Sequence, residues 1–318
     1  MIDFRYHVVS IVAVILALAL GLFLGSTTLQ GRVFDDLKGR TDSVTKQRDR
    51  LSAELSATQS QVSQGQKFDK ALLPYAVQGR LAGQLVSVIS GPRTSDSVRK
   101  QLFTVLEAAG ATVSADIRLQ NVLVDPKQDE FLHALAGHVT VPGDPTPSTA
   151  DGAALAVGQL AAVLGERPTT HNVSPSTIDT VLSTYSAANV VSVAKSTPTT
   201  KPGTLALVLS GPAQASTADP AQVTAEHTVL TELLRDLDRT ALGAVLAAPL
   251  PAQGTGPDAV SFADNDDGLT HDASTVTGVD TPAGLIATVY ALAGQVDGVA
   301  GQFGLGANDP LPSVSPTP

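Results

Sequence analysis

The chain has 318 residues and a formal net charge of −10, and 43% of its residues are hydrophobic. The length is enough for one large domain or two small ones with extensions. The acidic balance argues against nucleic-acid binding, which needs clustered Lys and Arg. The chain contains no cysteine, which excludes disulfides, zinc–cysteine sites, iron–sulfur clusters and cysteine nucleophiles.

An uncharged apolar run covers residues 8–26, after a short N-terminal tail of residues 1–7. Its length is close to the roughly 20 residues that a helix needs to cross about 30 Å of hydrocarbon. The alternative is a signal peptide cleaved after residues 17–19. The apolar run continues through residues 20–24, beyond the usual length of a signal h-region, and therefore favours an uncleaved transmembrane anchor. The flanking charges do not set its orientation, and we expect the C-terminal region to be extracytoplasmic, as is usual for a signal anchor.

Small residues recur at every fourth position of this run, at Ala13, Ala17, Gly21 and Gly25. A face of small side chains lets two helices approach closely in lipid, although such spacing also arises by chance in Ala-rich spans. We interpret Ala17, Gly21 and Gly25 as part of a dimerisation face.

A heptad pattern follows and predicts a coiled-coil stalk over residues 27–66. The alternative is a single long helix that lies on its own domain. Gly65 and Pro74 are expected to mark the end of this helix. Together with the small-residue face, the stalk predicts a homodimer. The apolar residues of the expected seam are Phe34, Leu37, Val44, Leu51, Leu55 and Val62.

Short apolar runs then alternate with helical periods, which predicts a Rossmann-like α/β sandwich over residues 80–306 with a mostly parallel sheet. Helices are expected to dominate its middle third, and residues 307–318 to form a disordered tail. The expected strands are 85–89, 112–117, 190–193, 205–209, 243–247 and 259–262. The expected helices follow the strands ending at residues 89 and 209 and also cover 129–135, 152–164, 176–187 and 282–295.

Two of these strands end in the same turn, Ser-Gly-Pro, at Ser90-Gly91 and at Ser210-Gly211. Both turns would lie at the carboxyl ends of parallel strands, where open α/β sheets bind ligands, so both are candidate pocket residues. Neither has the glycine spacing of a nucleotide-binding loop, and the chain has no G-x-S-x-G or H-E-x-x-H motif. We therefore expect no catalytic residues, no cofactor-binding residues and no enzymatic activity.

Two groups of residues are candidates for metal binding. The first is an acidic loop that misses the spacing of a calcium loop. The second is a pair at i and i+4 on one helix face, whereas His227 falls on an apolar face, where a core histidine is expected. Solvated turns are the alternative for the acidic loop. The loop comprises Asp264, Asp266, Asp267, His271 and Asp272, and the helix pair is Asp129 and His133.

The two ends of the sequence resemble the actinobacterial MctB-type family, which carries the label copper transporter. The N-terminal similarity covers residues 1–14 and 16–26, and the C-terminal similarity covers residues 274–284 and 304–306. The resemblance is loose between residues 126 and 203. The family includes SteB-like proteins, which implies a SteA-like membrane partner and a role in cell separation and peptidoglycan hydrolase control.

The residues of this chain do not favour the copper transport that the family label names. Cu(I) prefers Cys and Met ligands, and the only methionine of this chain is Met1. One transmembrane helix does not line a path across a bilayer without several copies. The sequence therefore favours an anchored dimeric scaffold or regulator of the cell envelope, with copper homeostasis or transport as the alternative that the family label implies.

Overall fold

The computed structural model describes residues 4–142, 144, 146–147, 149–167, 173–194, 201–266, 268–269 and 271–312, with the side chains of residues 4–5 and 26–37 left out. Contacts divide the chain into two compact units, Met1–Gly65 and Gln66–Pro318. The helix α1 (Phe4–Val77) forms most of the first unit, and its last turns belong to the second.

The first unit contains a helix that is long and apolar enough to cross a membrane. The stretch Tyr6–Gly25 has a mean hydropathy of 2.9, and none of it is buried within the chain. This agrees with the predicted anchor in length and composition. The heptad row lies on the same α-helix, as expected, whereas the pairing of two such helices stays a prediction.

The expected exit from this helix at Gly65 and Pro74 is wrong, because α1 continues to Val77. A proline inside a helix removes one backbone hydrogen bond and crowds the preceding turn. Here Leu73 and Val77 flank the proline and are buried in the core of the second unit. Their burial favours the last turn and opposes the cost of the proline.

Within the described residues, seven strands form one sheet in the order β3-β2-β1-β4-β5-β6-β7. All neighbouring strands are parallel except β3, which pairs antiparallel with β2 at one edge. The mostly parallel α/β fold is therefore confirmed. The strands are β1 (Leu85–Ser90), β2 (Thr112–Leu119), β3 (Val191–Val193), β4 (Leu205–Leu209), β5 (Gly243–Ala248), β6 (Ser274–Thr277) and β7 (Gln302–Gly304).

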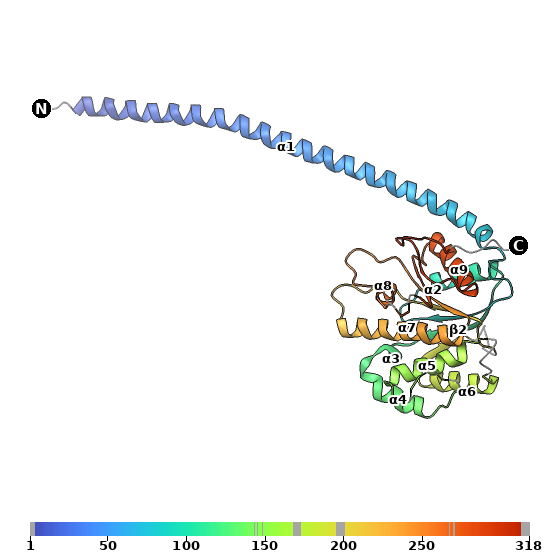
Figure 1. Ribbon diagram of the computed structural model, residues 1–318. Helices are drawn as coiled ribbons and strands as arrows, with labels where there is room; N and C mark the ends of the chain where they lie inside the picture. The colour runs from blue at the N-terminus through green and yellow to red at the C-terminus, as the bar shows by residue number, and fades with distance from the viewer. Residues whose placement is uncertain are drawn as a thin grey trace. The chain divides into compact units, whose positions relative to one another are not determined.

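Helices cover both faces of this sheet, and each face has its own apolar core (Figure 1). On one face α2 (Asp96–Ala108) and α9 (Pro282–Val296) pack with the last turns of α1. The opposite face carries α7 (Pro220–Thr240) and α8 (Ala259–Asp264). The two connections β4–α7–β5 and β6–α9–β7 run in the same direction along the sheet but cover opposite faces, so they have opposite hands.

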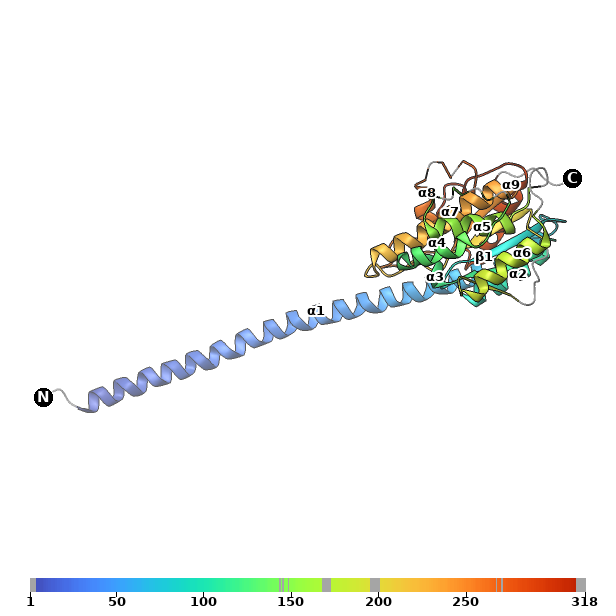
Figure 2. The same cartoon turned by 90° about the horizontal axis from the view of Figure 1, so that it is seen from below.

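A group of helices between β2 and β3 adds a further layer beyond α7, as Figure 2 shows from that side. Its centre is α5 (Gly152–Leu164), which has apolar side chains on all sides and is almost entirely buried. A helix that is apolar all round needs neighbours on every side. The neighbours are α3 (Asn121–Val124), α4 (Asp129–Gly137), α6 (Pro175–Ala187) and α7, with a short 3₁₀ turn η1 (Pro126–Gln128) before α4.

The strand predicted at residues 259–262 is wrong, because these residues begin the helix α8. A run of four residues fits both the helical and the strand period. The deciding signal is Asp258, whose carboxylate accepts a hydrogen bond of 2.8 Å from the backbone N–H of Ser261 and caps the helix.

The strands β6 and β7 were not predicted. β6 reads Ser-Thr-Val-Thr and lacks a continuous apolar run, yet Ser274, Thr275 and Val276 are buried. The Ser274 hydroxyl hydrogen-bonds the Gln295 amide, and the Thr275 hydroxyl donates to the Asp264 carboxylate. These tertiary partners satisfy the hydroxyl groups and let a polar sequence occupy a buried strand.

Candidate functional site

The two Ser-Gly-Pro turns lie side by side at the carboxyl edge of the sheet, because β1 and β4 are adjacent parallel strands. The backbone N–H of Gly91 donates to the Leu209 carbonyl at 2.7 Å. A Cβ on Gly211 would lie 2.6 Å from the Pro92 carbonyl oxygen. Only glycine permits this approach, so the repeated turn brings the two loops into direct contact.

An ion pair fills the space between the turns. Arg93 donates to the Pro212 carbonyl at 2.8 Å and to both carboxylate oxygens of Glu226, which lies on α7. The Gln214 amide donates to the same carboxylate at 3.0 Å. Burial raises the pKa of Glu226, and Arg93 opposes this shift. Arg93, Glu226 and Gln214 thus connect the two turns at this topological switch point.

An open pocket lies one strand further along, between the ends of β1 and β2. This β1–β2 pocket has a volume of about 220 Å³. Of the predicted pocket residues it includes Ser90 and Gly91, whereas Ser210 and Gly211 do not line it. The lining is completed by Pro92, Arg93, Thr94, Arg118, Leu119, Gln120 and Asn121.

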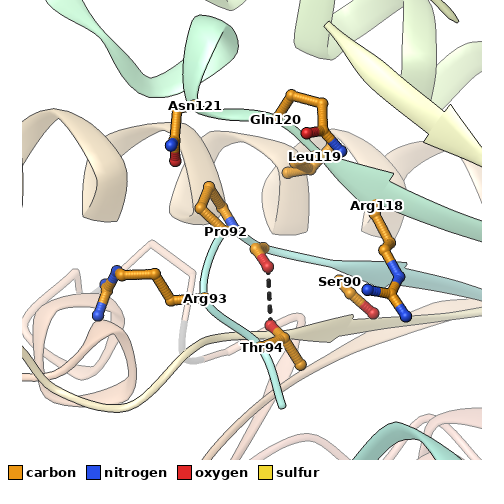
Figure 3. A pocket seen from close by; sticks show the side chains of 9 residues that line it. Ser90, Pro92, Arg93, Thr94, Arg118, Leu119, Gln120 and Asn121 are labelled. Carbon is orange, nitrogen blue, oxygen red and sulfur yellow. Dashed lines mark hydrogen bonds between the residues drawn. The ribbon is translucent and has the colours of Figure 1, made fainter. Parts of the chain in front are cut away.

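Arg118 and Ser90 are partners in the register of β1 and β2. Figure 3 shows the Arg118 guanidinium beside the Ser90 side chain, whereas Arg93 points to the other side. Arg118 also forms an ion pair with Asp96 in the first turn of α2. Sequence reasoning missed Arg118, although its place at the end of a predicted strand was a signal that could have found it.

A second and larger pocket, of about 440 Å³, lies at the carboxyl ends of β5, β6 and β7. We call it the β7-edge pocket. Thr275 and Thr277 from the C-terminal similarity line it, together with Leu305 and Gly306 after β7. Its acidic residues are Asp258 and Asp264, and its other lining residues are Leu250, Pro251, Val260, Ser261, Gln302, Phe303, Ala307 and Asn308.

The segment of residues 274–284 is held together by close backbone approaches. Gly278 has φ of +92°, a conformation that other residues rarely adopt. A Cβ on Gly284 would lie 1.9 Å from the Gly278 carbonyl oxygen. Thr281 caps α9 by accepting a hydrogen bond from the Gly284 N–H, and Asp280 accepts one from the Leu250 N–H. The residues that carry the C-terminal similarity therefore form the turn beside the β7-edge pocket.

The residues of the acidic loop have separate partners in the structure. Asp264 accepts a hydrogen bond from Thr275, and Asp266 pairs with Arg235. His271 and Asp272 are exposed, and Asp267 lies outside the described residues. Burial raises the pKa of Asp264, with a smaller contribution from the charge of Asp258.

The helix pair Asp129 and His133 lies against the start of α5, where Asp129 accepts a hydrogen bond of 3.4 Å from the Ala153 N–H. Across the described part of the chain, no three His, Cys, Asp or Glu side chains are grouped so as to hold a metal ion. His227 is buried and packs on Phe262, with ring centroids 5.6 Å apart, which confirms the expected core histidine.

Comparisons with known proteins agree with the resemblance seen at the two ends of the sequence. The chain is 28% identical over 149 residues to the copper transporter MctB of Mycobacterium tuberculosis (strain H37Rv), and equally to that of Mycobacterium bovis. The corresponding protein of Mycobacterium leprae is also 28% identical over 149 residues. Each match covers 47% of this chain and 47–48% of the relative, so the chain spans about half the length of the curated relatives it matches. A family model described as "Copper transport outer membrane protein, MctB" matches residues 1–312, and the chain therefore belongs to this family.

Proposed function

We propose that this member of the MctB family is a membrane-anchored envelope protein that works as a parallel dimer and presents its α/β domain on a helical stalk. The observation that carries the proposal is a row of exposed apolar side chains on α1. Val44, Leu51, Leu55 and Val62 are 55–64% exposed to solvent in the single chain. Their spacing of seven, four and seven residues places them on one seam of a heptad repeat.

The residues that flank this row favour pairing with a second copy. Six flanking positions lie between Val44 and Val62, and only Glu54 among them is charged, so like charges do not face each other at the other five. The uncharged five are Thr45, Gln47, Ser52, Gln59 and Gln61. Arg48 falls on the seam itself, but its guanidinium donates to the neighbouring Asp49 at 2.7 Å, which directs the charge toward the flank. Burial of the apolar row against a second copy would remove it from water.

The membrane segment carries a candidate pairing face of its own. Ala17, Gly21 and Gly25 lie on a four-residue spacing of the apolar stretch, and a Cβ on either glycine would meet no atom within 4 Å. Such a face admits a second helix at close range in lipid.

Cysteine cross-linking in intact membranes tests the dimer, because the chain has no cysteine of its own. In a parallel dimer Leu51→Cys and Leu55→Cys place two thiols across the seam, where a disulfide forms on oxidation. Ala53→Cys lies on the outer side of the same helix and is the matched control. We expect covalent dimers for both seam variants and far fewer for the control. Equal yields at all three positions would contradict the seam.

The cellular role is proposed from the family resemblance. We propose that the protein is a non-enzymatic scaffold or regulator with its α/β domain outside the cytoplasm, acting with a SteA-like membrane partner in cell separation. Deletion should then give chained cells with altered peptidoglycan hydrolase activity. Complementation with Leu51→Asp, Leu55→Asp should fail, while Ala53→Asp should restore separation. Normal septation in the deletion strain would refute this role.

Copper handling is a second candidate, and the printed names of the mycobacterial relatives favour it. Against it stands the donor set, since the chain has no Cys and the described residues bring no metal-binding group together. Calorimetric titration of the full chain with Cu(I) and Cu(II), together with copper sensitivity of a deletion strain, decides this candidate. Binding tighter than about 1 μM would support copper handling. Weaker binding with normal copper tolerance would eliminate it.

A further inference from the structure

The lining of the β1–β2 pocket is rich in hydrogen-bond donors. Its nine residues include two arginines, two hydroxyl side chains and the amides of Gln120 and Asn121, and none of them is acidic. Two of these groups are already occupied. Arg93 is bound to Glu226, and the Thr94 hydroxyl donates to the Gly91 carbonyl at 2.8 Å. Arg118, whose partner Asp96 is exposed, and Ser90 form the polar centre of the pocket.

Ser90 has an unusual environment for a buried hydroxyl. The residue is 1% exposed, and its oxygen has no hydrogen-bond partner. Most buried polar groups in folded proteins have a partner, because an unsatisfied one costs free energy. Figure 3 shows its side chain beside the Arg118 guanidinium, within the pocket lining.

Other unpartnered groups lie on the same side of the sheet, between it and α2. Arg99 and Asp116 form a buried ion pair at 3.0 Å, yet the Nε and Nη1 atoms of Arg99 and one carboxylate oxygen of Asp116 have no partner. These three atoms and the Ser90 oxygen are four of the six buried unpartnered side-chain atoms among the described residues. This end of the sheet therefore contains more buried polar side-chain atoms than it has hydrogen-bond partners for them.

The charge of Arg118 is accessible to a ligand. Its partner Asp96 is exposed, with a side chain that is 65% accessible, and exposed ion pairs of this kind are weak. The pocket also adjoins the N-terminus of α2, since Thr94 directly precedes the capping residue Ser95. The partial positive charge of a helix N-terminus adds to the guanidinium.

We propose that the β1–β2 pocket binds a small oxyanion group, the phosphate or carboxylate of a small molecule, between the Arg118 guanidinium and the Ser90 hydroxyl. The ligand oxygens replace Asp96 on Arg118 and give the Ser90 hydroxyl its missing acceptor. The amides of Gln120 and Asn121 are placed to contact the rest of the ligand. This proposal is independent of the dimer.

Calorimetry on the full chain in a maltoside detergent, which carries no phosphate, tests the site with inorganic phosphate and with acetate as probes. We expect saturable binding of at least one probe with a Kd below about 1 mM. Arg118→Gln should weaken it by about 10-fold or more, because it removes a charge-assisted hydrogen bond. Ser90→Ala should weaken it by about 3-fold or more. Asp96→Asn should strengthen it, because the competing carboxylate is gone.

Arg235→Gln is the matched control, since it removes the same charge from an ion pair with Asp266 that lies outside the pocket lining. It should leave the affinity unchanged. Tighter binding of phosphate would assign the pocket to phosphorylated ligands, and tighter binding of acetate to carboxylates. The opposite responses to Arg118→Gln and Asp96→Asn cannot come from loss of folding. Failure to saturate with either probe, or equal affinity of the wild type and Arg118→Gln, would overturn the proposal.

Discussion

Arg93 and Glu226 are 133 residues apart in the chain, and two hydrogen bonds of 2.7 and 2.9 Å join the guanidinium to the carboxylate. The pair connects the turn after β1 with the helix α7, which follows β4. Glu226 is buried, whereas the Arg93 side chain is 37% exposed. Arg93 also has φ of +64°, in the left-handed region. Arg93 thus pairs with Glu226 from a backbone conformation that costs free energy.

Replacing Arg93 should therefore destabilise the α/β domain by leaving the Glu226 carboxylate buried without its partner. Arg93→Ala should lower the free energy of unfolding by about 2 kcal/mol, less than for a fully buried pair. Arg93→Gly should cost about 1 kcal/mol less than Arg93→Ala, because glycine accepts the positive φ. Urea denaturation followed by circular dichroism measures both. Arg235→Ala is the control, because its partner Asp266 is 37% exposed whereas Glu226 is buried. An equal loss there would contradict the role of the buried carboxylate.

Gly284 should tolerate no side chain. A Cβ at this position would lie 1.9 Å from the Gly278 carbonyl oxygen and 2.3 Å from its carbon, so the turn before α9 would have to open. Gly284→Ala should destabilise the domain by about 3 kcal/mol in urea denaturation. Gly137→Ala is the matched helical control, since its Cβ would meet no atom within 4 Å. Similar stability of the two variants would show that the turn adapts at little cost.

Stability should fall in mildly acidic solution because of His227. Burial lowers the pKa of this imidazole below its ordinary value of 6.5, with a contribution from Arg93, while the nearby Asp258 opposes the shift. The unfolded chain then takes up the proton more readily than the folded one. The stabilising contribution is full above pH 6.5 and is lost as the pH falls through the lowered value.

Thermal unfolding of the wild type and His227→Phe between pH 7 and about pH 5 measures this effect. The difference in melting temperature should shift in favour of the variant as the pH falls. His133→Gln, which replaces an exposed histidine, is the control variant. A constant difference between wild type and His227→Phe would show that this histidine does not titrate with unfolding.

The helical layer between β2 and β3 depends on a buried hydrogen bond from Tyr185 to Gln159, with 2.5 Å between the two oxygens. The Gln159 amide nitrogen also donates to the Ala136 and Val139 carbonyls at 3.0 and 3.1 Å. Burial raises the pKa of the Tyr185 phenol, which keeps it protonated and able to donate at neutral pH.

Removal of the phenol oxygen should leave the Gln159 acceptor buried without a partner. Tyr185→Phe should cost about 1–3 kcal/mol of unfolding free energy, and Gln159→Leu should cost more because it frees three groups. Tyr75→Phe changes an exposed tyrosine and should have no measurable effect. Equal costs for Tyr185→Phe and Tyr75→Phe would mean that water replaces the lost donor.

Local patterns in the sequence were enough to predict most of the strands and helices of the α/β domain. Leu205–Leu209 and Gly152–Leu164 have the predicted bounds, because each apolar run is bounded by residues that disfavour its continuation. Ala259–Phe262 was too short for its period to distinguish helix from strand. Ser274–Thr277 was missed because its hydroxyl groups are satisfied by partners distant in sequence.

The candidate site was predictable only in part. The twin turns at Ser90-Gly91 and Ser210-Gly211 were placed at the right edge of the sheet, since the fold class dictates where parallel strands end. The ion pair beside these turns depends on Arg93, whose partner Glu226 comes from α7. No residue spacing in the sequence reveals the contact between Arg93 and Glu226. Nor does it reveal that Ser90 and Arg118 lie opposite each other on β1 and β2.

The sequence by itself determined the apolar N-terminal helix, the heptad row, the alternating α/β order and the family. Each of these depends on periodicity or on residues adjacent in the chain. Only the tertiary structure decided that the last turns of α1 join the core, that Arg93 pairs with Glu226 at the switch point, and that an open pocket lies between β1 and β2. Those features depend on contacts between distant residues, which local patterns do not encode.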